Sequence, residues 1–110
     1  MMTKHSKEAH RKLLQDIEAF TCGEVPNPLE IMRAAKLENW ESLVRRRGKE
    51  FVMTIRGDVY RHPEIDDGQK IQTPAVVWFD RKDRFVRTGT RLYVLGEQIG
   101  REIPIEGIDV

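Results

Sequence analysis

The sequence predicts an α+β fold in which two or three N-terminal helices pack on one face of a C-terminal antiparallel sheet of three or four strands. Two patterns support this prediction. Apolar residues recur at helical spacing in the first half, whereas β-branched and aromatic residues cluster between turn residues in the second. The length of 110 residues is typical of one domain. We therefore expect a single domain over residues 1–110, helical over about 7–47, with a β meander over about 50–96 and a tail over 97–110.

The first predicted helix covers Lys7–Thr21. Its apolar residues share one helical face: Leu13, Leu14, Ile17 and Phe20. Ser6 suits the N-cap, and Gly23 follows the last apolar position, as glycine does at many helix ends. The polar face mixes both charges, which argues against binding to a membrane surface, so we expect this helix to pack on the core.

A second helix should begin at Asn27-Pro28-Leu29-Glu30. The asparagine suits the cap, the proline suits the first turn, and a glutamate three residues after the cap completes a capping box. We expect this helix over Pro28–Lys36. A third helix should follow over Trp40–Arg47, capped by Asn39 and ended by Gly48. One bent helix that joins the two is the alternative.

Basic residues close the third predicted helix at Arg45-Arg46-Arg47-Gly48-Lys49. Cations in a last helical turn stabilise the helix dipole, and glycine suits the left-handed conformation that often follows. Four cations in five residues exceed what a helix end requires. Phosphate or nucleic-acid binding through Arg45, Arg46 and Arg47 therefore stays open as a second interpretation.

Three β-strands are predicted in the second half. They cover Phe51–Ile55 with a continuation to Tyr60, then Lys70–Asp80, and then Arg84–Leu95. Pro63 should end the first strand because proline has no backbone donor, and Pro74 requires an edge position or a bulge in the second. Gly89 indicates a bulge in the third. The short connections make consecutive strands neighbours in an antiparallel sheet.

His62 is the one catalytic candidate. It ends a predicted strand, precedes a proline and faces the carboxylate-rich segment Glu64–Gly68, so a neutral imidazole could serve as a general base. In the simpler interpretation, the ring bonds a neighbouring backbone group and organises the turn. His5 and His10 lack the i, i+4 spacing of a helical pair of metal ligands. We therefore predict no metal site and no cofactor.

Arg87 and Arg91 lie four positions apart on the third predicted strand. On a regular strand both side chains would point to one face, where two guanidinium groups can grip a phosphate or a carboxylate. Salt bridges across the sheet are the alternative interpretation. Arg84 and the neighbouring Arg81-Lys82 add charge, so residues 81–91 are expected to form a basic strip.

The composition narrows the class of protein. Charged residues make up 34%, apolar residues 39%, and the net charge is +1, which fits a soluble protein and argues against a polycation. Cys22 is the lone cysteine, so no intramolecular disulfide can form and a reducing, cytoplasmic setting fits. The first residues lack the apolar stretch of a secretory signal, and no segment approaches the about 20 apolar residues of a membrane span.

A series of motifs runs through the second half of the chain. They are Gly57-x-Val59-x-x-His62-Pro63, Gly68-x-x-Ile71-x-Thr73, Asp80 and Arg87-Thr88-x-Thr90-Arg91-x-Tyr93-x-Leu95-Gly96, with Leu37-x-x-Trp40 upstream. Over about residues 10–96 the chain resembles a family of small uncharacterised proteins of alphaproteobacteria such as rhizobia. It departs at Pro74, where the family pattern has serine, so no role for a hydroxyl carries over there. The resemblance implies a soluble bacterial α+β protein and implies no activity.

The sequence as a whole favours a small binding or regulatory module without enzymatic activity. Its partner would be nucleic acid or an acidic protein, bound through Arg84, Arg87 and Arg91, with Arg45–Arg47 as a second contact. The second hypothesis is a small hydrolase or nuclease-like enzyme, which requires His62, an acid and Arg87 or Arg91 in one cleft. The third is an oligomerisation or immunity-type protein that uses an exposed sheet edge or the first helix, which leaves a homodimer open.

Overall fold

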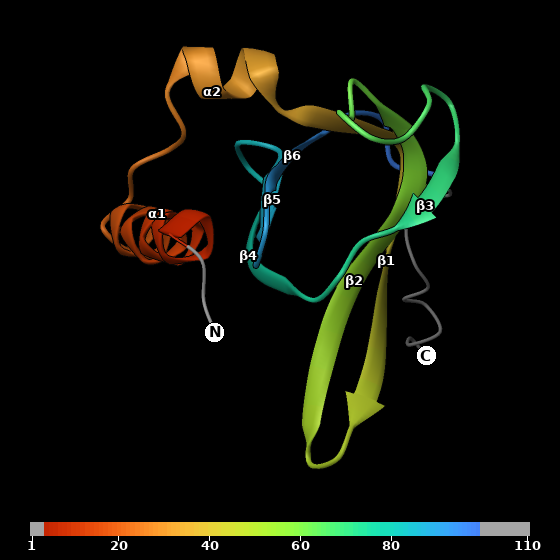
Figure 1. Cartoon of the computed structure of the whole chain (residues 1–110). Helices are drawn as coiled ribbons and strands as arrows, with labels where there is room; N and C mark the ends of the chain where they lie inside the picture. Colours follow the sequence, from red (N-terminus) through yellow and green to blue (C-terminus); the bar gives the residue numbers. More distant parts are fainter. Residues whose placement is uncertain (1–3, 100–110) are drawn as a thin grey trace.

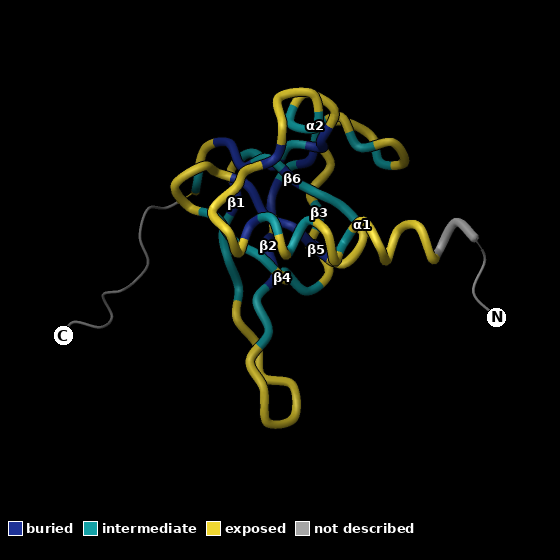
Figure 2. Tube along the Cα trace, turned by 90° about the vertical axis from the view of Figure 1, so that its left-hand side faces the viewer, coloured by how far each residue is buried: buried dark blue, intermediate teal, exposed yellow. Residues whose placement is uncertain are grey.

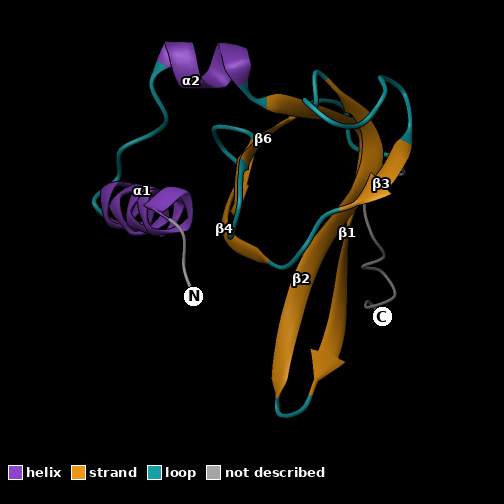
Figure 3. Cartoon of the chain, viewed as in Figure 1, coloured by secondary structure: helices purple, strands orange, loops and turns teal. Residues whose placement is uncertain are grey.

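The computed structural model describes residues 4–99, which form two helices followed by a six-stranded sheet (Figures 1 and 3). In chain order the elements are α1 (Lys4–Thr21), α2 (Pro28–Arg33), β1 (Ala35–Arg47), β2 (Glu50–Tyr60), β3 (Lys70–Gln72), β4 (Val76–Asp80), β5 (Phe85–Thr88) and β6 (Leu92–Leu95). The strand order is β3-β2-β1-β6-β5-β4. Neighbouring strands are antiparallel, apart from β1 and β6, which are parallel. β2 also contacts β4, so the sheet curls round toward itself.

The predicted arrangement of helices over a small antiparallel sheet is wrong. The sheet is mixed and has six strands, and α1 is the one main helix of the described residues. Helices and strands still occupy separate parts of the chain, so the broad α+β class remains compatible. One helix start is confirmed, that of α2, whereas α1 begins at Lys4, so Ser6 lies within the helix and is not its N-cap. α1 includes the predicted Lys7–Thr21, and α2 begins at Pro28 with a complete capping box, although it ends at Arg33 and not at Lys36.

The third predicted helix, over Trp40–Arg47, is wrong because these residues belong to β1. Ala35 and Leu37 point toward the core, as alternate residues of a strand do. Asn39 then adopts a φ of 50°, and the register of β1 against β2 shifts at this bulge. Trp40 therefore also points inward. Leu37 and Trp40 lie three positions apart and are both buried, which imitates the spacing of a helical face.

Gly48 ends a strand and not a helix. It forms a two-residue turn with Lys49 between β1 and β2, closed by the pairing of Arg47 with Glu50. Gly48 has a φ of 63° and Lys49 a negative φ, as in a type II′ hairpin turn, which favours glycine at the first central position. The hairpin extends well beyond the rest of the sheet (Figure 1). Arg45–Arg47 therefore lie near the tip of a protruding hairpin.

The second and third predicted strands are each divided in two. Thr73-Pro74-Ala75 separates β3 from β4, because a proline cannot donate to a ladder. The residues Gly89–Arg91 form a turn between β5 and β6, which pair as a hairpin in place of one bulged strand. The antiparallel pairings of β2 with β3 and of β4 with β5 follow the predicted meander. The departure is at β6, which pairs in parallel with β1.

The core lies on the inner face of the curled sheet. Its buried apolar side chains come from four strands: Ala35, Leu37, Trp40, Ile55, Val59, Val86, Tyr93 and Leu95. Figure 2 shows these buried segments at the centre, with the hairpin tip and much of α1 exposed. Gly57 allows β1 and β2 to approach closely at the bulge, because a Cβ there would lie 3.1 Å from the Cβ of Trp40. The indole N–H of Trp40 donates to the carbonyl of Gly96 at 3.0 Å.

α1 covers the outer face of β4 and β5. The ring of Phe20 lies 5.8 Å from that of Trp78 and 5.0 Å from that of Phe85, measured between centroids. β5 is consequently buried on both faces. Neither helix of the described residues combines the length and the apolar character that a membrane crossing requires. Most of the predicted tail lies outside the described residues; its first part forms a parallel bridge between Gln98 and Trp40.

Candidate functional site

The predicted site residues lie in separate parts of the structure. Arg45–Arg47 are on the protruding β1–β2 hairpin, and Arg84 precedes β5. Arg87 is buried under α1 and the charge of Arg91 acts on His62, but the structure brings these two arginines together at the border of one cleft. The expected basic strip over residues 81–91 is therefore absent from the described structure, because Gly89 begins a turn and the two arginines that flank it do not share a strand.

The tip of the β1–β2 hairpin, which we define as residues 44–52, carries the densest group of exposed cations in the described structure. These are Arg45, Arg46, Arg47 and Lys49. Among residues 4–99 no ion pair involves any of the four. The Arg46 Nε donates to the Gly48 carbonyl at 3.1 Å, which holds that side chain over the turn. Glu50 is the one acid in this segment, so the hairpin tip has a net charge of +3.

The hairpin tip presents two chemically different faces. Strand pairing places Arg46 opposite Phe51 and Val44 opposite Met53, on the same face as the core. Phe51 is 73% exposed and Val44 is 62% exposed, so this face is apolar and open at its end. A large exposed aromatic side chain beside arginine is typical of binding surfaces.

The opposite face of the hairpin carries Arg45 and Arg47. Arg45 and Arg47 border a groove of about 390 Å³, which continues along β2 to the segment between β3 and β4. Thr54 and Gln72 also line it, together with the apolar Val52 and Ala75, and the Gln72 amide donates to the Thr54 hydroxyl at 2.9 Å. The groove thus combines two guanidinium groups with neutral hydrogen-bonding side chains, which suits an anionic chain laid across it.

The Arg84 side chain makes a structural hydrogen bond within the fold. Its backbone adopts a φ of 61° at the turn before β5, and its Nη2 donates to the Gly96 carbonyl at 2.8 Å. It borders a shallow groove that also contains Glu38 and Asp83, so its surroundings are mixed in charge. These contacts explain Arg84 as a residue that ties the β4–β5 turn to the end of β6.

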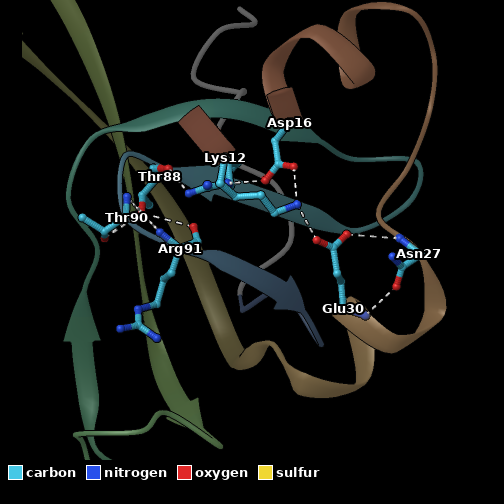
Figure 4. Close-up of polar contacts among 8 residues, drawn as sticks. Lys12, Asp16, Asn27, Glu30, Thr88, Thr90 and Arg91 are labelled. Atoms are coloured by element: carbon cyan, nitrogen blue, oxygen red, sulfur yellow. Dashed lines mark hydrogen bonds and ion pairs between the residues drawn. The ribbon is translucent and has the colours of Figure 1, made fainter. Parts of the chain in front are cut away.

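The Arg87 side chain also has structural partners. Its side chain is 5% exposed, its Nε donates to Asp16 of α1 at 3.0 Å, and its Nη1 donates to the Thr88 carbonyl at 2.8 Å. Lys12 extends this contact, because its Nζ lies 2.7 Å from Asp16 and 2.6 Å from Glu30 of α2 (Figure 4). Hydrogen bonds to these two acids raise the pKa of Lys12. Arg87 therefore anchors both helices to β5.

His62 has a partner inside its own turn. Its Nδ1 accepts a hydrogen bond from the Glu64 N–H at 3.0 Å, the kind of local backbone contact that the simpler interpretation expects. Burial and the nearby charge of Arg91 lower the pKa of His62. Its ring lies 6.4 Å from that of Tyr93. Arg87 and Arg91 border the same cleft, where Asp16 holds Arg87, but His62 is not among the residues that line it, so the triad required for a hydrolase is only partly assembled.

Metal binding finds no support in the described residues. Within residues 4–99 no group of three or more histidine, cysteine or carboxylate side chains is placed to hold a metal ion.

Two residues of the hairpin tip, Lys49 and Phe51, were missed as site residues by sequence reasoning. The sequence does contain a pattern that predicts the hairpin on which they lie. Gly48 within a two-residue loop, followed by β-prone residues, is typical of a hairpin.

Comparisons with known protein families, with curated proteins and with solved structures found no match for this chain.

Proposed function

We propose that this protein is a small cytoplasmic bacterial binding module that contacts nucleic acid through the tip of its β1–β2 hairpin. The proposal rests on the protruding hairpin tip, whose four cations form no ion pair with any residue in 4–99. A bacterial origin rests on the family resemblance. The exposed free thiol of Cys22 suits a reducing compartment.

The shape of the hairpin suits double-stranded DNA. A two-stranded β-ribbon fits the major groove, which is about 12 Å wide. Arg45 and Arg47 project from one face of the ribbon and Arg46 from the other, so cations can reach phosphates on both sides of a groove. The net charge of the chain is only +1, so attraction to DNA would be confined to this tip.

Fluorescence anisotropy with a short labelled DNA duplex at low salt tests the proposal. The test variant replaces Arg45, Arg46 and Arg47 with glutamine. A matched control replaces three exposed cations away from the hairpin: Lys7, Arg11 and Lys82. Both variants lose the same charge, and only the hairpin variant should lose most of the binding.

Three results would contradict the proposal. They are the absence of binding to both duplex and single-stranded DNA at low salt, an equal loss in the control variant, and equally tight binding to polyglutamate. The last result would indicate an acidic protein as the partner. Light scattering on the same samples shows whether the exposed apolar end at Phe51 instead joins two copies of the chain.

A further inference from the structure

We propose that the cleft between α1, α2 and the β5–β6 turn binds a small organic anion, that is, a carboxylate or phosphate group on an apolar body. This site is separate from the hairpin tip and does not depend on the proposed nucleic-acid binding. The cleft has a volume of about 310 Å³, which is near the lower end of small-molecule pockets. Residues far apart in the sequence border it, including Phe20, Arg33 and Arg91.

The charges of the cleft leave a cationic excess. Four cations border it, and the two acids, Asp16 and Glu30, are both engaged by Lys12 or Arg87. Arg33 and Arg91 form no ion pair with any residue in 4–99. Guanidinium groups at the rim of a partly enclosed space bind carboxylate and phosphate in bidentate geometry.

The remaining wall of the cleft is apolar. It is formed by Phe20, Pro26, Ala35 and Leu92. Inorganic phosphate would leave this wall without a contact, whereas a ligand with a small hydrocarbon or aromatic body would cover it. Burial of such a body contributes favourable free energy in proportion to its apolar area. The composition of the wall therefore favours an organic anion over an inorganic one.

The cleft is held in shape by its own polar contacts. The ion pairs from Arg87 through Asp16 and Lys12 to Glu30 fix one side, and Asn27 caps the helix that carries Glu30 (Figure 4). A site fixed before binding loses little conformational freedom when a ligand enters.

The opposite rim is fixed at its backbone. The Thr88 hydroxyl accepts from the N–H groups of Thr90 at 3.3 Å and Arg91 at 3.2 Å. The guanidinium of Arg91 extends away from the ion-paired side and is joined to none of the residues drawn in Figure 4. The rim thus fixes the backbone of Arg91, and its guanidinium forms no ion pair with any residue in 4–99.

Nuclear magnetic resonance titration of the ¹⁵N-labelled protein tests this inference. The probes are benzoate, phenyl phosphate, inorganic phosphate and the neutral benzyl alcohol. We expect benzoate or phenyl phosphate to shift the amide signals of Phe20, Thr90 and Leu92 saturably, and the stronger of the two identifies the preferred head group. Inorganic phosphate and benzyl alcohol should bind more weakly, since each lacks one half of the recognition.

Arg91→Gln should weaken binding of the preferred probe about tenfold or more, the change expected on loss of one charge-assisted hydrogen bond. Lys82→Gln, a change at an exposed position in the β4–β5 turn, is the matched control and should bind as the wild type does. The spectrum of Arg91→Gln without ligand shows whether the variant is folded, and Arg33→Gln repeats the test from α2 if it is not.

The inference is overturned if neither organic anion shifts cleft signals, or if benzyl alcohol shifts them equally. It is also overturned if shifts occur only at the hairpin tip, or if Arg91→Gln and Arg33→Gln both bind as the wild type does. Failure of the hairpin variant to lose DNA binding would leave this site unaffected, because the two experiments report on different residues.

Discussion

Replacement of Asp16 by alanine should destabilise the protein far more than a helix-surface change would. Asp16 is the one ion-pair partner that the described residues offer to Arg87, whose side chain is 5% exposed, and Asp16 itself is 15% exposed. Removal of one partner of a buried pair leaves an uncompensated charge and costs about 3–5 kcal/mol. Because Asp16 retains some exposure and Arg87 keeps its bond to Thr88, we expect the lower end, about 3 kcal/mol.

Lys12→Ala is the matched control on the same helix. Its side chain is 49% exposed and also pairs with Asp16, so its loss should cost at most about 1 kcal/mol. Urea unfolding, followed by tryptophan fluorescence, measures both. Trp78 lies against Phe20 and therefore also reports on docking of α1. With a slope of about 1–3 kcal/mol per molar urea, the Asp16→Ala midpoint should fall by about 1–3 M.

A double variant separates lost charge from lost packing. Asp16→Leu with Arg87→Met removes both charges and keeps apolar volume, so it should recover most of the stability. The account of Arg87 as an anchor is refuted if Asp16→Ala is no less stable than Lys12→Ala, or if the double variant is as unstable as Asp16→Ala.

Three further predictions concern single positions. Gly57→Ala should cost about 1–3 kcal/mol in urea unfolding, because its Cβ would press on the backbone of Trp40; unchanged stability would contradict the close approach. Burial and the charge of Arg91 lower the pKa of His62 in the folded protein. As the pH falls, His62 is therefore protonated in the unfolded chain, near its ordinary pKa of 6.5, before it is protonated in the folded protein. The free energy of unfolding should thus decrease as the pH drops below 6.5, until the pKa of His62 in the folded protein is passed. His62→Gln should make the free energy of unfolding depend less on pH in this range, and an unchanged pH dependence would contradict the lowered pKa of His62. Phe51→Ala should change stability by less than about 0.5 kcal/mol yet weaken DNA binding, and equal affinity would exclude contact through this side chain.

Local signals in the sequence predicted some elements correctly. The capping box that starts at Asn27 identified the first residue of α2, because caps are read from neighbouring side chains. The error over β1 has a local cause. The bulge at Asn39 changes the strand alternation so that Leu37 and Trp40 are both buried, and that spacing is indistinguishable from a helical one.

The candidate site was predictable only in part. The cations of Arg45–Arg47 were visible in the sequence, but their meaning depended on whether they end a helix or extend a hairpin. The pairing of Arg87 with Asp16 joins residues 71 positions apart, and no local pattern encodes it. The cleft is equally nonlocal, since the turn at Arg91 meets two helices from the other end of the chain.

The salt dependence of DNA affinity tests the central claim most directly. Each phosphate contact contributes about 0.9 to the slope of log affinity against log salt concentration, so engagement of all four hairpin cations gives a slope of about −3.6. The variant without Arg45, Arg46 and Arg47 retains Lys49 alone at the tip and should show a slope of about −1. A steep wild-type slope that becomes shallow in this variant, and stays steep in the Lys7, Arg11 and Lys82 control, is the predicted result. Equal slopes in all three proteins would contradict the claim that the hairpin tip binds nucleic acid.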